Sequence, residues 1–432
     1  MEPNSPCPNQ LIGLSQAQLN EVMQRHALFR QSLPGGRRAV LAGYDLSGLD
    51  LTGADLSHSD LTGSSFFAAN LSGCRFDCAT MYACDFREAN LEKASMIHAD
   101  LRGCYFGGAV LIGANLFEAD LRAGAHVTRD KRGDFHVVAP QDRPTVASTP
   151  GFSGADLTNA TLAGVIAVKT DFSEAVMRGC KLVRAHIRGA NFTGTNLQDA
   201  DFAQADTREA CFRGAVISGA NFDYTNLAGA DLQDVLSDKP SGRLLGELNA
   251  SLDELLRLHM EFIESCGAAG AALDLSGFDL RGAGVFAGVC LTMLTAPRAV
   301  FYGLDFSGTA LQAARCPKAD FRDCRFNGAD LRGIVLTGAT LNGASMRGVK
   351  LRALAIDDAR RMVSDLSGAS LRHADLRDVD LRGVLLAGAD LSFADLTGAD
   401  LTGVDLTGTR LSAAKVSREQ LDSARSAAIA GV

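Results

Sequence analysis

Residues 387–408 read AGADLSFADLTGADLTGVDLTG, and an apolar centre returns at every fifth position, at Leu391, Leu396, Leu401 and Leu406. An aspartate stands directly before each leucine, and a small alanine or valine stands two places before it. A five-residue step matches neither the 3.6-residue period of an α-helix nor the alternation of an ordinary strand. The segment therefore predicts a repeat architecture of another kind.

The same step extends through most of the 432 residues. Runs of apolar centres cover residues 46–121, 157–232 and 286–411, and two further centres, Leu275 and Leu280, precede the third run. Twenty-residue intervals separate the following phenylalanine centres: Phe66, Phe86 and Phe106; Phe172, Phe192 and Phe212; Phe286, Phe306 and Phe326. This spacing indicates a solenoid with four units per coil, in which stacked coils bury centres that one coil cannot bury alone.

The units ADLTG, ANLSG, ADLRG and ANFTG resemble those of the pentapeptide-repeat family. The resemblance implies a right-handed quadrilateral β-helix, in which the centre and the small residue two places before it point inward. We therefore expect an all-β solenoid, arranged as two tandem units that are each preceded by a short α-helix.

Two predicted helices define the tandem arrangement. One follows Ser15 and the other follows Ser251, which opens a capping box. Their apolar stripes have the same spacing: Leu19, Val22, Met23, His26 and Phe29; Leu252, Leu255, Leu256, His259 and Phe262. The predicted parts are a flexible N-terminus, a first helix plus solenoid, a linker, a second helix plus solenoid, and a helical C-terminal cap: residues 1–14, 15–236, 237–250, 251–416 and 417–432.

Two places interrupt the repeat. From 121 to 157 the distance is not a multiple of five, and residues 122–151 are charged and contain three prolines. Long loops of this kind are usually functional or disordered. In the second solenoid Arg361 stands at a centre position, which predicts a bulge or a bent coil over 357–361.

Composition excludes several classes of protein. The net charge of −8, from 42 basic and 50 acidic side chains, disfavours direct binding of nucleic acid. No apolar run reaches the length of a membrane span, about 18 residues. Six of the eleven cysteines fall at inward positions, where they act as small hydrophobes: Cys74, Cys84, Cys104, Cys180, Cys316 and Cys324. Free thiols in such number indicate a reducing compartment, so we expect a cytoplasmic protein.

The sequence offers little for an enzyme. His26 and His259 lie at equivalent positions on the two apolar stripes, where we expect each to hydrogen-bond a backbone carbonyl of the first coil. No Cys-x-x-Cys pair occurs, and no histidine has a metal-ligand partner at the usual spacing. We expect no catalytic residue, no metal and no cofactor.

Acidic residues before the centres form columns. With four units per coil, Asp375 would stack below Asp395 and Asp380 below Asp400. Some family members resemble a DNA duplex in shape and charge and bind type II topoisomerases, so a DNA-mimicking modulator of gyrase or a related topoisomerase is an alternative function. Three arginines at twenty-residue intervals would form a basic ladder on the same solenoid and weaken this alternative: Arg332, Arg352 and Arg372.

The preferred prediction is a non-catalytic protein-binding scaffold that uses rigid β-helix faces and the protruding charged loop. The predicted partner-binding residues are Arg129, Lys131, Arg132, Asp134, Asp380 and Asp400. An uncapped solenoid end would also allow two copies to pair. The identity of the protein partner stays open.

Overall fold

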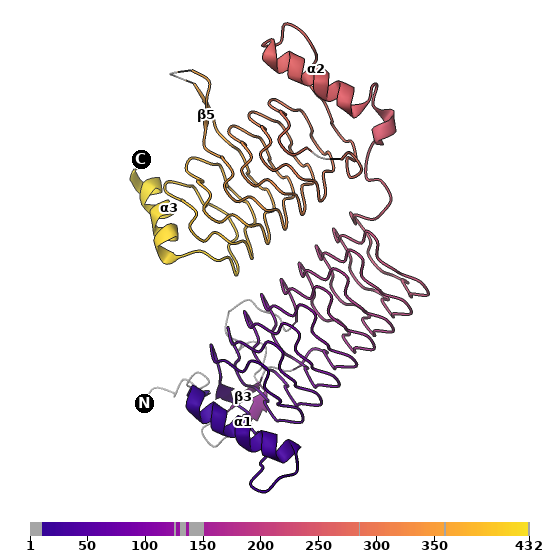
Figure 1. Ribbon diagram of the computed structural model, residues 1–432, viewed down its shortest axis with the longest axis vertical. Helices are drawn as coiled ribbons and strands as arrows, with labels where there is room; N and C mark the ends of the chain where they lie inside the picture. The colour runs from indigo at the N-terminus through magenta and orange to yellow at the C-terminus, as the bar shows by residue number, and fades with distance from the viewer. Residues whose placement is uncertain are drawn as a thin grey trace, which may run out of the picture. The chain divides into compact units, whose positions relative to one another are not determined.

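The computed structural model describes residues 11–124, 127–129, 135–137, 151–284, 286–357 and 360–430. The chain forms two compact units, residues 1–238 and 239–432. The elements of the first unit are β1 (Ile12–Gly13), α1 (Gln16–Arg30), β2 (Tyr44–Asp45), β3 (Val127–Arg129) and β4 (Phe135–Val137). Those of the second are η2 (Leu245–Glu247), α2 (Leu252–Glu264), β5 (Leu354–Ala355), β6 (Arg361–Met362) and α3 (Arg418–Ala430) (Figure 1).

Each unit is a stack of rectangular coils held by parallel bridges between residues twenty positions apart, as at Asp60↔Thr80 and Thr80↔Asp100. The N–H of Leu61 donates to the carbonyl of Thr80 at 2.8 Å, and the N–H of Thr80 donates back to the carbonyl of Ser59 at 2.9 Å. Four five-residue units therefore make one coil, as predicted. The architecture is a quadrilateral β-helix.

The five-residue unit follows from its turn. The N–H of Ala69 closes a turn on the carbonyl of Phe66 at 3.0 Å, and Ala68 between them has a φ of 53°. Glycine takes this left-handed conformation without steric cost, which explains why it so often stands two places after a centre. The aspartate before a centre adds an Asx turn, as where Asp50 Oδ1 accepts the N–H of Thr52 at 3.0 Å.

Stacked phenylalanines form the core of the first unit. The rings of Phe86 and Phe106 lie 5.0 Å apart, and Phe106 stacks on Phe152 at 4.3 Å. The ladder thus continues directly across the insertion. Gly151 already bridges Tyr105, so the solenoid resumes at Gly151 and Phe152, five residues before the Leu157 at which the second run was expected to begin.

The second solenoid contains an excursion of ten residues. Val335 bridges Asp365, and Lys350 bridges Asp380, each across thirty residues. Most other bridges in this stack span twenty residues, and the two of its first coil, Asp274↔Thr295 and Asp279↔Val300, span twenty-one. The extra residues form an antiparallel hairpin of β5 and β6, which leaves the coil (Figure 1). The expected bulge at 357–361 is therefore a hairpin. The five-residue pattern did not reveal the hairpin, because ten extra residues equal two complete repeats and leave the phase unchanged.

The first coil of the first unit is capped on its open edge. β1 pairs in parallel with β2 of the coil, and the Gln16 side chain donates to the carbonyl of Asp50 at 2.8 Å and accepts its N–H at 3.0 Å. Leu19 and His26 of α1 are fully buried. Two residues of the expected flexible segment 1–14 thus form a paired strand.

The second unit begins with the same device. Arg243 adds to the edge of the first coil opposite Phe278, donating its N–H to the carbonyl of Gly277 at 2.8 Å. Its carbonyl accepts the N–H of Asp279 at 2.8 Å. α2 then covers the coil, and at the far end α3 donates two hydrogen bonds from Gln420 to the carbonyls of Leu396 and Ala399. The predicted helices after Ser251 and Ser417 are confirmed.

The last coil of the first unit is less covered. Its centres Ile217, Phe222 and Leu227 are half-buried, and Leu232 is 41% exposed. Centres inside the stack, such as Phe202, are fully buried.

Candidate functional site

The charged loop contains a short hairpin. β3 pairs with β4 in antiparallel register, with Arg129 opposite Phe135. Arg129 is the last residue of β3, and its side chain lies outside the described residues. Lys131, Arg132 and Asp134 lie outside them entirely. Four of the six predicted partner-binding residues are thus close in sequence, in or beside the connection of one hairpin.

The other two predicted residues lie on the second solenoid. Asp380 bridges Asp400 one coil above, so the expected stacking is confirmed. Arg382 lies between their carboxylates, with Nε 2.9 Å from Asp380 Oδ1 and 3.1 Å from Asp400 Oδ2. Arg352 Nε lies 3.1 Å from Asp380 Oδ2. The acidic column therefore carries its own counter-charges.

This pairing recurs along both units. In each case the aspartate before a centre holds the arginine two places later in a fork of hydrogen bonds: Asp85–Arg87, Asp100–Arg102, Asp120–Arg122, Asp206–Arg208, Asp320–Arg322, Asp330–Arg332 and Asp375–Arg377. The fork from Arg377 lowers the pKa of Asp375, and the fork from Arg382 lowers that of Asp380. Such bidentate pairs neutralise the columns.

The expected basic ladder is wrong. The ten-residue hairpin shifts the later coils, so that Lys350 bridges Asp380 and Thr340 bridges Ser370. Arg372 therefore follows Asn342, whose side chain accepts the Arg372 N–H at 3.2 Å. Arg332 and Arg352 stay in one column but do not share it with Arg372.

The two cap histidines serve the fold. Nδ1 of His26 accepts the N–H of Ala39 at 3.0 Å, and Nε2 lies 3.0 Å from the carbonyl of Ser57, which confirms the expected carbonyl contact. Nδ1 of His259 accepts the N–H of Leu273 at 3.0 Å, but its buried Nε2 makes no hydrogen bond to a described residue, so only His26 makes the expected carbonyl contact. Burial lowers the pKa of both rings, and the backbone of Ser57 or Thr292 partly offsets this decrease. A ring held by the backbone in this way is poorly placed for proton transfer to a substrate.

The inward cysteines are packing residues, as expected. All six are buried, and the thiol of Cys74 donates to the carbonyl of Leu51 at 2.8 Å. Burial raises the pKa of Cys74 and of Cys316 to about 12, so neither thiol is an active nucleophile at neutral pH.

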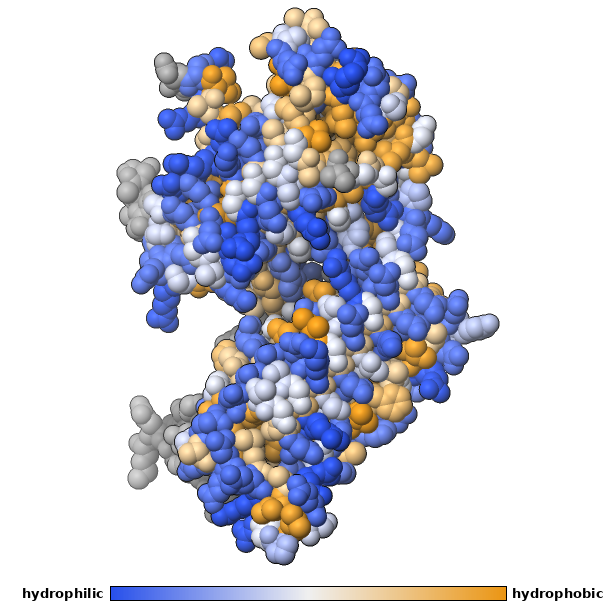
Figure 2. Space-filling model, in the orientation of Figure 1, coloured by the Kyte–Doolittle hydropathy of each residue, from blue (hydrophilic) through white to orange (hydrophobic). Residues whose placement is uncertain are grey.

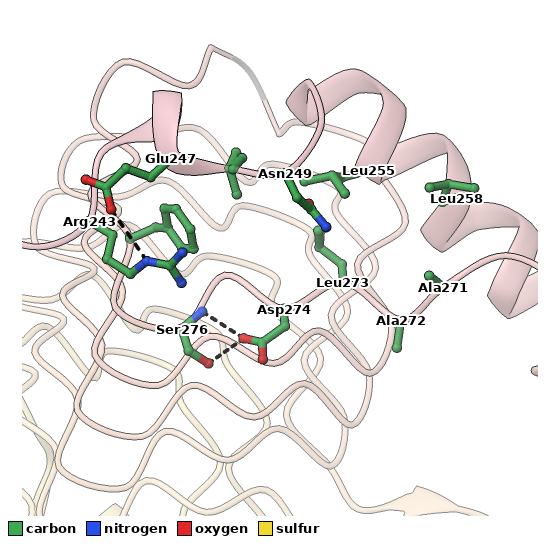
Figure 3. A pocket seen from close by; sticks show the side chains of 12 residues that line it. Arg243, Glu247, Asn249, Leu255, Leu258, Ala271, Ala272, Leu273, Asp274 and Ser276 are labelled. Atoms are coloured by element: carbon green, nitrogen blue, oxygen red, sulfur yellow. Dashed lines mark hydrogen bonds and ion pairs between the residues drawn. The ribbon is translucent and has the colours of Figure 1, made fainter.

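A cavity of about 380 Å³ opens at the start of the second unit, between η2, α2 and the first coil (Figure 3). Arg243 lies over the ring of Phe278, 4.0 Å from its centroid, and its Nε is 3.8 Å from Glu247 Oε2. Asp274 accepts the N–H of Ser276 at 2.8 Å. Sequence reasoning missed this cavity, because it lies where the predicted linker, with Arg243 and Glu247, meets α2 and the first coil.

Apolar side chains form the other side of the cavity. Leu255 and Leu258 of α2 face Ala271 and Ala272 across it. In Figure 2 apolar residues gather beside α2 on the face in view. The cavity therefore combines one apolar wall with a small charged group, which is typical of ligand-binding sites.

The described residues hold no group of three or more His, Cys, Asp or Glu side chains placed to bind a metal ion. Within the same residues, none of the helices combines the length and the apolar composition that a membrane span requires.

The model of the family of pentapeptide repeats matches eight segments, some of which overlap, and together they cover more than half of the chain: residues 39–81, 64–103, 84–122, 155–194, 195–234, 314–352, 364–403 and 374–412. No curated protein matches the chain significantly.

Several solved structures are similar. A trypsin-treated form of QnrB1, a plasmid-mediated fluoroquinolone resistance protein, is 20% identical with a TM-score of 0.32, over 46% of this chain and 90% of that one. HetL, a pentapeptide repeat protein involved in heterocyst differentiation regulation in the cyanobacterium Nostoc sp. strain PCC 7120, is 20% identical with a TM-score of 0.11, over 91% and 92%. A pentapeptide repeat protein of the Arabidopsis thaliana thylakoid lumen is 22% identical with a TM-score of 0.10, over 40% and 68%. Similarity at this level says nothing about what this chain binds.

Proposed function

Because this chain belongs to the pentapeptide-repeat family, we propose that it is a non-catalytic scaffold that binds a protein partner. The observation that carries the proposal is the bridge ladder, which places the outward positions of the described coils at a regular spacing. A rigid, repetitive surface of this kind suits recognition of another protein. The proposal includes no cofactor and a cytoplasmic location.

The first excursion is the proposed contact. The strands β3 and β4 bring the ends of the connection 130–134 together, which supports a role for Arg129, Lys131, Arg132 and Asp134 in binding. Asp380 and Asp400 are proposed as secondary contacts, because the paired arginines already neutralise them.

Two deletions test the loop. Removal of residues 124–149 is expected to abolish capture of the partner from the native cell lysate, while the thermal melt of the protein stays close to wild type. The matched control removes residues 354–363, the second excursion. That deletion joins Ala353 to Ser364 and keeps the five-residue phase, so capture should persist. Capture that survives the first deletion would contradict the loop assignment.

The topoisomerase alternative has one favourable observation, the stacked pairs Asp375↔Asp395 and Asp380↔Asp400. The arginine forks oppose it, since a neutralised column does not imitate a phosphate backbone. We expect no inhibition of DNA gyrase supercoiling by the purified protein at micromolar concentration. Inhibition that increases in an Arg377→Gln, Arg382→Gln double variant would favour the DNA mimic instead.

Pairing of two copies is proposed at the last coil of the first unit, where Leu232 and the half-buried centres leave apolar surface uncovered. Sedimentation velocity should show a dimer that Leu227→Asp converts to a monomer. A monomeric wild-type protein would refute this assignment.

We also propose that the two helix-plus-solenoid domains span residues 15–236 and 251–416.

A further inference from the structure

The first coil of each unit has one edge that no preceding coil covers, and the chain itself pairs with part of this edge in both units. β1 lies along Tyr44–Asp45 in the first unit, and Arg243 lies opposite Phe278 in the second. Both additions use main-chain hydrogen bonds, such as the 2.8 Å bond from the Arg243 N–H to the carbonyl of Gly277. The edge is therefore built to accept an extended segment.

The neighbouring stretch of the second edge stays open. Inside the stack, Asp365 donates its N–H to the carbonyl of Ile334 at 2.9 Å and accepts the N–H of Leu336 at 2.7 Å. Asp274 begins the same column, since it bridges Thr295 and the column continues through Arg315 and Val335 to Asp365. On its other side, no described residue bonds the N–H or the carbonyl of Asp274. Within 272–276 the N–H of Leu273 is already bonded to His259 Nδ1, so the open edge consists of the main chain of Asp274 and the residues next to it, which line the cavity.

The walls of the cavity define what would fit there. Arg243 is matched by Glu247 and stacked on Phe278, whereas the described residues place no basic group within ion-pair distance of Asp274. The site therefore offers one unmatched carboxylate beside the open edge. The apolar wall from Leu255 and Leu258 suits an aliphatic side chain.

We propose that the open edge at residues 272–276 binds an extended peptide as an additional β-strand, with a basic side chain beside Asp274 and an aliphatic one against α2. Main-chain hydrogen bonds to an exposed sheet edge supply affinity in this mode, and side-chain pockets supply specificity. The inference rests on the proposed protein-binding function but assigns a second site, distinct from the 122–151 loop.

A phage-displayed library of random seven-residue peptides, selected on the full-length protein, tests the proposal. The selected peptides should combine Lys or Arg with an aliphatic residue. Labelled synthetic versions of the selected peptides should bind the Asp274→Asn variant about tenfold more weakly than wild type, because the pair between the basic side chain of the peptide and Asp274 is lost. Ala272→Trp, which fills the cavity, should abolish binding.

The chain supplies a matched control, because Asp274-Leu-Ser-Gly277 and Asp365-Leu-Ser-Gly368 have the same sequence in the same column. In both, the aspartate accepts the N–H of the serine two places later. Asp365→Asn should leave peptide binding unchanged, because this residue lies inside the stack. Binding should also slow hydrogen exchange at 272–276 and leave 364–368 unaffected.

The proposal is overturned if no peptide is selected, if the selected peptides bind Asp274→Asn and Ala272→Trp like wild type, or if exchange at 272–276 does not slow. These outcomes are independent of the loop experiment, because deletion of 124–149 leaves the edge at 272–276 in place. A lysate partner lost with the loop and a peptide lost with Asp274→Asn would identify two separate sites.

Discussion

The two N-terminal caps are built alike and differ in one connection. In each, a short segment pairs with the first coil, as the strand β1 in the first unit and as the single residue Arg243 in the second. A helix follows, and a buried histidine accepts a backbone N–H of the coil. In the first unit Gly13 is two places before the N-cap Ser15. In the second unit Arg243 is eight places before Ser251, and η2 lies between.

The longer connection changes how tightly the helix closes the coil. Leu19 and Leu252 are equivalent, because each stands seven residues before the histidine of its cap, His26 or His259. Leu19 is fully buried, whereas Leu252 is half-buried. The second cap contains the cavity beside Asp274. The same capping device therefore closes one solenoid tightly and leaves a cavity and an open edge on the other.

Truncation of the equivalent leucines should show the largest difference between the caps. Leu19→Ala is expected to lower the free energy of unfolding of the first unit by about 2–5 kcal/mol, because it empties a fully packed site. Leu252→Ala should cost the second unit clearly less, since its side chain is already partly in water. Hydrogen exchange followed by mass spectrometry in urea reports the two units separately. Equal losses would show that the caps are equally tight.

Removal of either histidine ring should destabilise its own unit by a smaller amount. His26→Ala leaves the buried N–H of Ala39 without its acceptor, and His259→Ala does the same to Leu273. An unpaired buried donor costs about 1–3 kcal/mol. Urea unfolding of each variant, monitored by hydrogen exchange in each unit separately, measures the loss in the free energy of unfolding. The idea of a shared device fails if His26→Ala weakens the first unit and His259→Ala leaves the second unchanged.

Acidification should loosen both caps. The pKa of each histidine is lowered from 6.5, mainly by burial, so the folded state keeps the neutral ring and the unfolded state takes up a proton first. This contribution to stability is complete above pH 6.5 and is lost as the pH falls through the lowered pKa. Aspartates with a lowered pKa, such as Asp375, also stabilise the folded state, but this contribution is lost only when the pH falls below their ordinary pKa of 3.8. In a His26→Gln, His259→Gln double variant the urea midpoint should therefore depend less on pH between pH 7 and 5. A pH dependence equal to that of wild type would contradict the assignment of the loss to the two histidines.

The smallest effect concerns the strand residue of the second cap. Arg243→Gln keeps the main-chain pairing and removes the guanidinium from the face of Phe278. At an exposed site this contact contributes about 0.5–1 kcal/mol. A thermal melt of the second unit should drop slightly, while Ile12→Gln at the equivalent strand position of the first unit tests the strand without such a contact. A large loss from Arg243→Gln alone would mean that the side chain, rather than the strand, holds the cap.

The repeat could be predicted in detail because each position has one physical task. Leu61 and Phe66 were assigned inward and are fully buried, and the aspartate before a centre makes an Asx turn. The equivalence of His26 and His259 was also visible, since both lie at the same place on their stripes. The capping strands could not be found: a strand of two residues has no periodicity, and its only signal is the edge that it covers.

The two interruptions of the repeat also differ in how clearly the sequence showed them. The insertion after Leu121 breaks the five-residue phase and was visible. The hairpin of β5 and β6 adds two complete repeats, and only the charge of Arg361 marked it. The predicted ladder of Arg332, Arg352 and Arg372 was wrong for this reason. Of the predicted contacts, the stacking of Asp380 on Asp400 was found. The fork from Arg382 to Asp380 is a local pair two residues apart, whereas the contact of Arg382 with Asp400 required knowing which coils are neighbours.

The amino-acid sequence by itself determined the coil: apolar centres, small inward neighbours and left-handed turn positions leave a five-residue unit one way to close. Only the tertiary structure decided which edges are covered, which charges meet across neighbouring coils and where a cavity remains. These depend on contacts between residues such as Arg243 and Phe278, or Asp380 and Arg352, that stand far apart in the chain, and no local pattern encodes a contact of that range.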